Sequence, residues 1–93
     1  MSDITSNPWI IDAAAIITDR PVTVVRMEYQ PAAAGNVIQI EDRNGRIVWK
    51  RTAGTFTEYR GVIVWNTEFT FNGFEVATIT AGTLYVWVKV TGN

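Results

Sequence analysis

The stretch GTLYVWVKV at residues 82–90 decides the fold class. Four aliphatic residues in it recur at every second position: Leu84, Val86, Val88 and Val90. This spacing places them on one face of an extended chain, and it leaves Tyr85 and Trp87 on the opposite face with Lys89 as the only charged residue. A strand with one face in water alternates apolar and polar residues, whereas this one is apolar or aromatic on both faces for most of its length. We therefore expect either a central strand covered on both faces or a strand whose second face meets a partner.

The composition indicates one small globular domain with part of its surface covered. The chain has 93 residues, of which 47% are hydrophobic and 12% aromatic. That is enough for a packed core and too apolar for a disordered chain. Charged residues make up only 18% of the chain, below the roughly 25% of an average protein. Because a small β domain has much surface to solvate, this shortage favours a surface that associates with something else.

Missing residue types exclude several kinds of chemistry. The sequence has no cysteine and no histidine, so it has no disulfide, no thiolate ligand and no imidazole base. Its serines, Ser2 and Ser6, lie close to the N-terminus, and no glycine-rich phosphate loop is present. The adjacent acids Glu41 and Asp42 flank a turn, where solvated carboxylates are ordinary. We expect no enzyme, no metal site and no cofactor.

The net charge and the N-terminal sequence limit the classes of partner that we expect. The net charge of -1 provides no basic field for phosphates, which argues against nucleic acid. Residues 1–7 are short and polar, without the basic and apolar regions of a signal peptide, and we expect them to form a flexible arm ahead of a domain at 8–93. No apolar run approaches the roughly 18 residues needed to cross a bilayer, so no membrane partner is expected.

Turn residues divide the rest of the chain into short strands. The sequence predicts a strand near 8–12, a bend over 13–18 that leads into a short strand, and a break at Asp19-Arg20-Pro21. A long strand follows at 22–30. Its apolar residues change face part-way, which is typical of a bulge or of a strand that passes over a sheet edge.

Two Asn-Gly pairs are expected to form tight turns. Asn44-Gly45 joins a strand at 36–42, with Ile38 and Ile40 inward, to a strand at 46–51 in which Ile47 and Trp49 alternate with basic neighbours. Asn72-Gly73 is expected to separate a strand at 67–71 from one at 74–80, and residues 62–65 form a further strand. The seven to eight short strands predict an all-β, single-domain, two-sheet sandwich that is jelly-roll-like. An immunoglobulin-like sandwich and a small closed barrel are the alternatives.

Aromatic residues are the candidate interface, because aromatic and arginine side chains dominate protein interfaces. We assign Trp49 and Trp65 to the core. The expected partner-contacting residues share an exposed or loop position: Trp9, Phe56, Tyr59, Tyr85 and Trp87. Exposed indole rings also stack on sugars, and Asn66 and Glu68 near Trp65 could hold sugar hydroxyls, so a glycan-binding surface is the alternative.

Four segments together carry a resemblance to a known class of protein: residues 7–9, 42–49, 72–79 and 82–88. With their turn and strand motifs, they resemble small β-sandwich virion proteins of tailed bacteriophages, some of which are capsid decoration (cement) proteins. Where that pattern ends in a tyrosine-rich final strand, this chain has Trp87.

The resemblance implies a function and a location. It implies a structural protein made in the host cytoplasm and placed on the capsid exterior of the virion, where it binds the major capsid protein and itself, with a trimer favoured. It implies no catalytic residues. The alternatives are a glycan- or receptor-binding module of a phage head or tail fibre and a host-encoded interaction domain.

Overall fold

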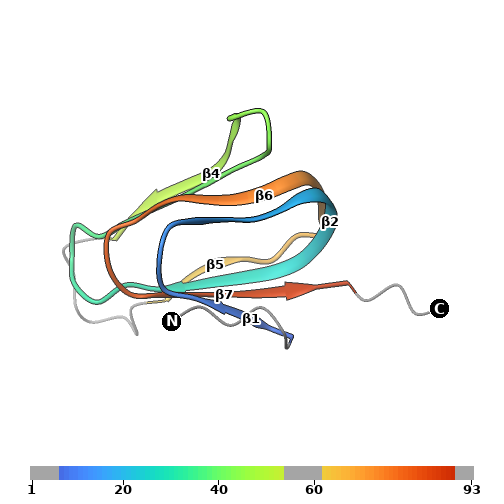
Figure 1. The fold of residues 1–93 in the computed structure, drawn as a ribbon. Coiled ribbons are helices and arrows are strands. Elements are labelled where there is room, and N and C mark those ends of the chain that lie inside the picture. The colour runs from blue at the N-terminus through green and yellow to red at the C-terminus, as the bar shows by residue number, and fades with distance from the viewer. Residues whose placement is uncertain (1–6, 54–61, 90–93) are drawn as a thin grey trace.

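A computed structural model describes residues 7–53 and 62–89, in which seven β-strands and no helix occur (Figure 1). The strands are β1 (Trp9–Ile11), β2 (Ala15–Gln30), β3 (Val37–Glu41), β4 (Ile47–Thr52), β5 (Ile63–Trp65), β6 (Phe69–Ile79) and β7 (Thr83–Val88). The expected arm at 1–7 falls outside the described residues except for Asn7. Its side-chain amide donates to the Val88 carbonyl at 2.9 Å and its amide oxygen accepts from the Val88 N–H at 3.0 Å, which joins the two ends of the described chain.

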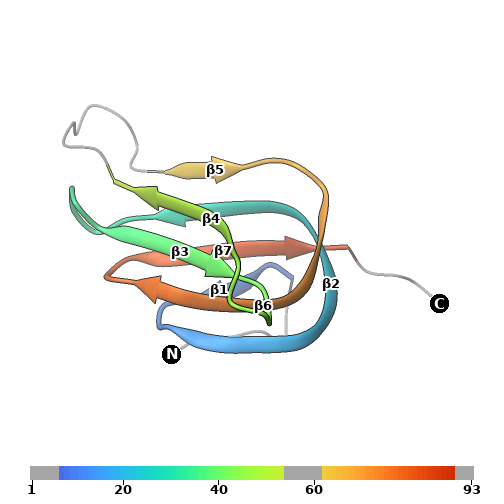
Figure 2. The same cartoon turned by 90° about the horizontal axis from the view of Figure 1, so that it is seen from above.

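All seven strands form one antiparallel sheet that is rolled into two layers. The strand order is β1-β7-β2-β6-β3-β4, and β5 pairs with β2 beside this path. The second half of β2 pairs with β7 and β5, whereas its first half pairs with β6, so β2 passes from one layer to the other (Figure 2). The all-β sandwich that the sequence predicts is confirmed, and its layers are hydrogen-bonded into a continuous sheet.

Strand β2 bends because its ladder with β6 slips twice. Between the pairs Ile16↔Glu75, Thr18↔Phe74 and Pro21↔Asn72, β2 advances one residue more than β6 at each step. Extra residues of this kind curve a strand, and proline is tolerated in a sheet at such a bulge. The expected break at Asp19-Arg20-Pro21 is therefore wrong: the strand runs through it, and the strand that starts after the bend is long rather than short.

The bulge expected in the 22–30 strand is confirmed. Val24 pairs with Val88 and Arg26 with Trp87, so Val25 is an extra residue on β2. Because of it, Val24 and Met27 both point into the core although they lie three positions apart, and both are fully buried. A strict alternation would have placed one of them in solvent.

Asn72-Gly73 lies inside β6 and is not a turn, so the prediction of a hairpin there is wrong. Gly73 has φ +90°, and a Cβ on it would lie 2.6 Å from the Cβ of Arg43. The backbone N–H of Arg43 donates to the Asn72 carbonyl at 2.9 Å. Glycine is needed for this conformation and this close approach, and it lets Phe71 and Phe74 both point inward.

The hairpin at Asn44-Gly45 is confirmed. Gly45 has φ +80°, its N–H donates to the Asp42 carbonyl at 3.0 Å, and the Asp42 carboxylate accepts the N–H groups of Asn44 and Arg46. The ladder then slips, because Ile40 pairs with Trp49 but Glu41 pairs with Ile47.

This slip changes which face Ile47 occupies. Trp49 points into the core at 7% exposure, whereas Ile47 is 56% exposed. The expectation that Ile47 and Trp49 share a face is wrong, because Val48 is an extra residue on β4 between them.

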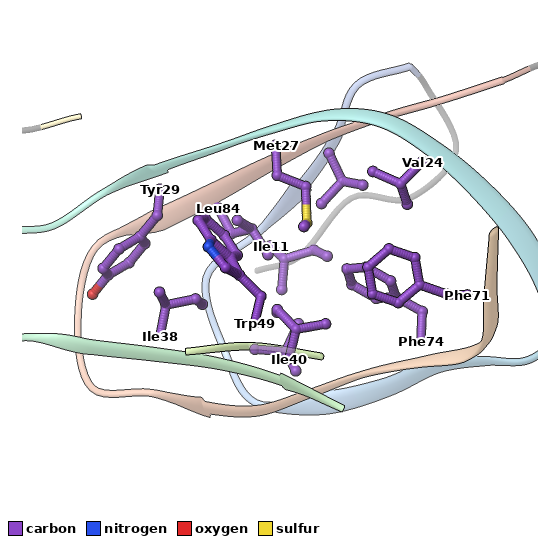
Figure 3. Close-up of a cluster of buried hydrophobic side chains, with 12 residues drawn as sticks. Ile11, Val24, Met27, Tyr29, Ile38, Ile40, Trp49, Phe71, Phe74 and Leu84 are labelled. Carbon is purple, nitrogen blue, oxygen red and sulfur yellow. The ribbon is translucent and has the colours of Figure 1, made fainter. Parts of the chain in front are cut away.

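The core lies between the two layers (Figure 3). Ile38, Ile40, Leu84 and Val86 are fully buried, which confirms the inward stripes predicted for β3 and β7. Among the described residues, the largest fully buried side chain is that of Tyr29, and its hydroxyl donates to the Ala81 carbonyl at 2.5 Å. The hydroxyl group of the buried Tyr29 is therefore hydrogen-bonded, as buried polar groups usually are.

Candidate interaction surface

The outer side of the layer formed by β1, β7, β2 and β5 carries a row of side chains across four strands. Ile10 lies opposite Tyr85, Tyr85 opposite Glu28, and Glu28 opposite Val64. Trp87 lies opposite Arg26 in the next row. We call this set the outer β7 face: Ile10, Arg26, Glu28, Val64, Tyr85 and Trp87.

The burial of Leu84 and Val86 on the inner side of β7 determines which residues of this strand lie on the outer β7 face. Successive side chains of a strand point to opposite sides, so Tyr85 and Trp87 must point outward, as the period of two predicts. Both are half-buried by their neighbours, and their ring centres lie 6.4 Å apart with the planes tilted by 35°.

An arginine–carboxylate pair lies beside the two rings. The Arg26 guanidinium carbon is 5.8 Å from the centre of the Trp87 ring. Its Nε donates to Glu28 Oε2 at 2.9 Å and its Nη2 to the same oxygen at 2.5 Å. The positive charge is therefore compensated and the side chain held in place before any partner arrives, which lowers the ordering and desolvation cost of covering this face.

The other candidate residues are placed differently. Trp9 lies on the inner side of β1, and its ring meets that of Phe74 edge to face at 5.8 Å. Ile10 takes the outward position on this strand and is 36% exposed. Trp9 is thus not part of the outer β7 face. Phe56 and Tyr59 lie outside the described residues.

The core assignment of Trp49 is confirmed, and Trp65 is half-buried against the same core. The two rings meet edge to face at 5.9 Å, and the Trp65 indole N–H donates to the Thr67 carbonyl at 2.7 Å. Glu68 is paired with Lys89 at 3.3 Å. At the suggested sugar-binding surface, the Trp65 ring is therefore packed against other aromatic rings and the Glu68 carboxylate is paired with Lys89.

Sequence reasoning missed Arg26, Glu28, Ile10 and Val64 as members of the surface. Arg26 and Glu28 are two positions apart and so share a face, which was readable from the sequence. Their position beside Trp87 was not, because it depends on the bulge at Val25 and on the pairing of β2 with β7.

Among residues 7–53 and 62–89, no group of three or more acidic, histidine or cysteine side chains could hold a metal ion. The same residues contain no helix that is long and apolar enough to cross a membrane.

Comparison with protein-family models, with curated proteins and with solved structures finds no match to this chain.

Proposed function

We propose that this chain is a structural protein of a phage virion, a capsid decoration protein that binds the outside of the head and bridges neighbouring capsid subunits. The resemblance of residues 7–9, 42–49, 72–79 and 82–88 supplies the class. The observation that carries the proposal is the outer β7 face, where two aromatic rings and a compensated Arg26–Glu28 pair lie on a rigid sheet.

Such a face suits a protein that works by contact alone. Tryptophan, tyrosine and arginine contribute most of the binding energy in protein interfaces. The face is backed by fully buried side chains of β7 and β2, Leu84, Val86 and Met27 among them, so little backbone order has to be gained on binding. A decoration protein binds in many copies, and contacts among linked copies raise the effective concentration of the rest. The proposed partners are the major capsid protein and further copies of this chain, with a trimer favoured by the resemblance.

The glycan- or receptor-binding alternative has less support. It needs an aromatic ring that is free to lie flat against a sugar, together with free polar neighbours. Trp65 is packed edge-on against Trp49, and Glu68 is paired with Lys89.

The test is to mix the purified protein with phage heads that lack it and to measure co-sedimentation and the temperature at which the heads rupture. We expect the wild-type protein to co-sediment and to raise that temperature. Trp87→Glu should lose both effects. Ile16→Glu is the matched control, because Ile16 is 69% exposed on the other layer, and it should behave as wild type. Failure of the wild-type protein to co-sediment, or equal binding by both variants, would overturn the proposal.

A further inference from the structure

The chain contains the dipeptide Asn-Gly twice, at Asn44-Gly45 and at Asn72-Gly73, and the two pairs lie in different surroundings. In such a pair the glycine nitrogen can attack the asparagine side chain, because glycine has no Cβ to obstruct the approach. Asparagine accordingly counts among the thermolabile residues of proteins. The structure around each pair decides whether it reacts.

Asn44-Gly45 lies in open solvent. Both residues are exposed in the β3–β4 turn, residues 42–46. Within the described part of the chain, no residue is hydrogen-bonded to the Asn44 side chain, so its carboxamide is free to turn towards the Gly45 nitrogen. A Cβ on Gly45 would meet nothing within 4 Å. A cyclic product at this position therefore meets no steric obstacle.

Asn72-Gly73 is confined by its neighbours. The Asn72 side chain is exposed, but Gly73 is buried, and a Cβ on it would lie 2.6 Å from the Cβ of Arg43. Asn72 lies opposite Pro21 in the ladder with β2, and its carbonyl accepts the N–H of Arg43 at 2.9 Å. The attack requires rotation about the bond between the asparagine Cα and its carbonyl carbon. In β6 this rotation would break the hydrogen bond with Arg43 and distort a strand that is paired on both sides.

Hydrogen bonds within the turn control the reaction at Asn44. The Gly45 N–H donates to the Asp42 carbonyl at 3.0 Å, so this bond must open before the nitrogen can attack. The Asp42 carboxylate accepts the N–H groups of Asn44 at 2.8 Å and Arg46 at 3.0 Å and so keeps the turn closed. Opening an exposed turn costs less free energy than opening a central strand. Asp42 thus slows the reaction without taking part in it.

We propose that Asn44 is a site of spontaneous deamidation, with water as the only co-reactant. The Gly45 nitrogen attacks Cγ of Asn44 and loses its proton, and the side-chain nitrogen leaves as ammonia, which gives a cyclic succinimide. Water then opens the ring. Cleavage between the Gly45 nitrogen and Cγ gives aspartate. Cleavage between that nitrogen and the original carbonyl carbon gives isoaspartate, whose main chain runs through the former side chain and contains an additional carbon atom.

The products change the turn in different ways. Each adds a negative charge, but only isoaspartate lengthens the backbone between Asp42 and Arg46 and so disturbs the hydrogen bonds that close the turn. Asn44 does not belong to the outer β7 face, so this modification is independent of the decoration function.

The test is to keep the folded, full-length protein in mildly alkaline buffer, where the glycine N–H loses its proton more easily, and to follow each asparagine by peptide mass spectrometry. We expect Asn44 to react at least about tenfold faster than Asn72, because its turn opens at a lower free energy. In concentrated urea the two sites should react at similar rates, because glycine follows both and the fold holds neither. Equal rates in the folded protein, or no reaction at Asn44 while both sites react in urea, would overturn the proposal.

A substitution tests the role of Asp42. Asp42→Ala should speed deamidation of Asn44 in the folded protein about tenfold, because it frees both N–H groups that the carboxylate holds. The rate in urea should not change. Glu28→Gln removes a carboxylate from the other layer and should leave the rate at Asn44 unchanged in both conditions. Equal effects of the two variants would contradict control by the turn.

The modified protein gives a further measurement. Its isoaspartate form should exchange the amide hydrogens of Gly45 and Arg46 faster than Asn44→Asp, which has the same charge and an unchanged backbone. Equal exchange in the two proteins would show that the turn tolerates the additional atom and would overturn the proposed effect on its hydrogen bonds.

Discussion

The guanidinium group of Arg26 lies over the ring of Trp87, 5.8 Å from its centre, on the directly opposite position of the neighbouring strand. The same group donates two hydrogen bonds to Glu28. An indole ring and a carboxylate thus hold one cation between them on the outer β7 face.

This contact predicts a measurable coupling between Arg26 and Trp87. In a double-mutant cycle of Arg26→Gln and Trp87→Leu, the coupling in the free energy of unfolding should be about 0.5–1 kcal/mol, as for other partly exposed cation–π pairs. Urea denaturation measures it. Arg20→Gln combined with Trp87→Leu is the control and should be additive. Additivity of the first pair would show that the ring and the guanidinium do not interact in solution.

Gly73 and Gly35 should respond differently to alanine. Both have positive φ, +90° and +89°, but a Cβ at Gly73 would meet Arg43 at 2.6 Å whereas one at Gly35 would meet nothing within 4 Å. We expect Gly35→Ala to lower the free energy of unfolding by about 1 kcal/mol from backbone strain alone. Gly73→Ala should lower it by more than about 3 kcal/mol, because the β3–β4 turn must also move. Equal midpoints in urea would contradict the close approach of Arg43.

The Asp42 carboxylate should stabilise the β3–β4 turn. It accepts the N–H groups of Asn44 at 2.8 Å and Arg46 at 3.0 Å, so Asp42→Ala leaves both donors to water. The expected loss is about 1–2 kcal/mol of unfolding free energy. Asp19→Ala removes a carboxylate of similar charge on the exposed part of β2 and should change the unfolding free energy by less than about 0.5 kcal/mol. Thermal or urea unfolding of the two variants checks the difference.

Tyr29 should make the protein less stable at high pH. Burial raises the pKa of the Tyr29 hydroxyl above its usual value, and a hydrogen bond with the Thr80 side chain opposes this only in part. The folded state therefore holds the phenolic proton more tightly than the unfolded state. The protonated Tyr29 hydroxyl therefore contributes its full share to the free energy of unfolding below about pH 10, the ordinary pKa of tyrosine. This contribution is lost as the pH rises through the raised pKa of the folded state.

Tyr29→Phe tests this pH dependence. The variant loses the hydrogen bond to Ala81, so it should be less stable at pH 7 by about 1 kcal/mol. Above pH 10 its unfolding free energy should fall less steeply than that of the wild type. Parallel curves for the two proteins would mean that the phenol does not titrate differently on folding.

Much of the fold was predictable because alternation survives wherever a strand is regular. The alternation of Ile38 and Ile40 and that of Leu84 and Val86 identified the inner sides of β3 and β7 correctly. Asn44-Gly45 identified the hairpin. The outward position of Trp87 followed from the same alternation.

The wrong predictions concern residues that are typical of turns or strand breaks but that lie inside continuous strands of this fold. Asn72-Gly73 has the residues of a tight turn, but there the positive φ of glycine bends a continuous strand against Arg43. Pro21 has the residue type of a strand break, but it lies at a bulge where no regular ladder bond is required of it. Each outcome depends on a segment that is distant in the sequence, and periodicity does not reveal such a segment.

The rolled β2 also sets the order in which the molecule can assemble. Its second half is paired on one side by β7, near the C-terminal end of the chain, and Asn7 is bonded to Val88. Among the described residues, every strand pair except β3 with β4 thus joins segments that are far apart in the sequence, a topology that folds slowly. During synthesis, neither layer can be completed when only the first two-thirds of the sequence has left the ribosome, because one layer needs β6 and the other needs β7. We therefore expect the nascent chain to complete its fold only after β7 has emerged.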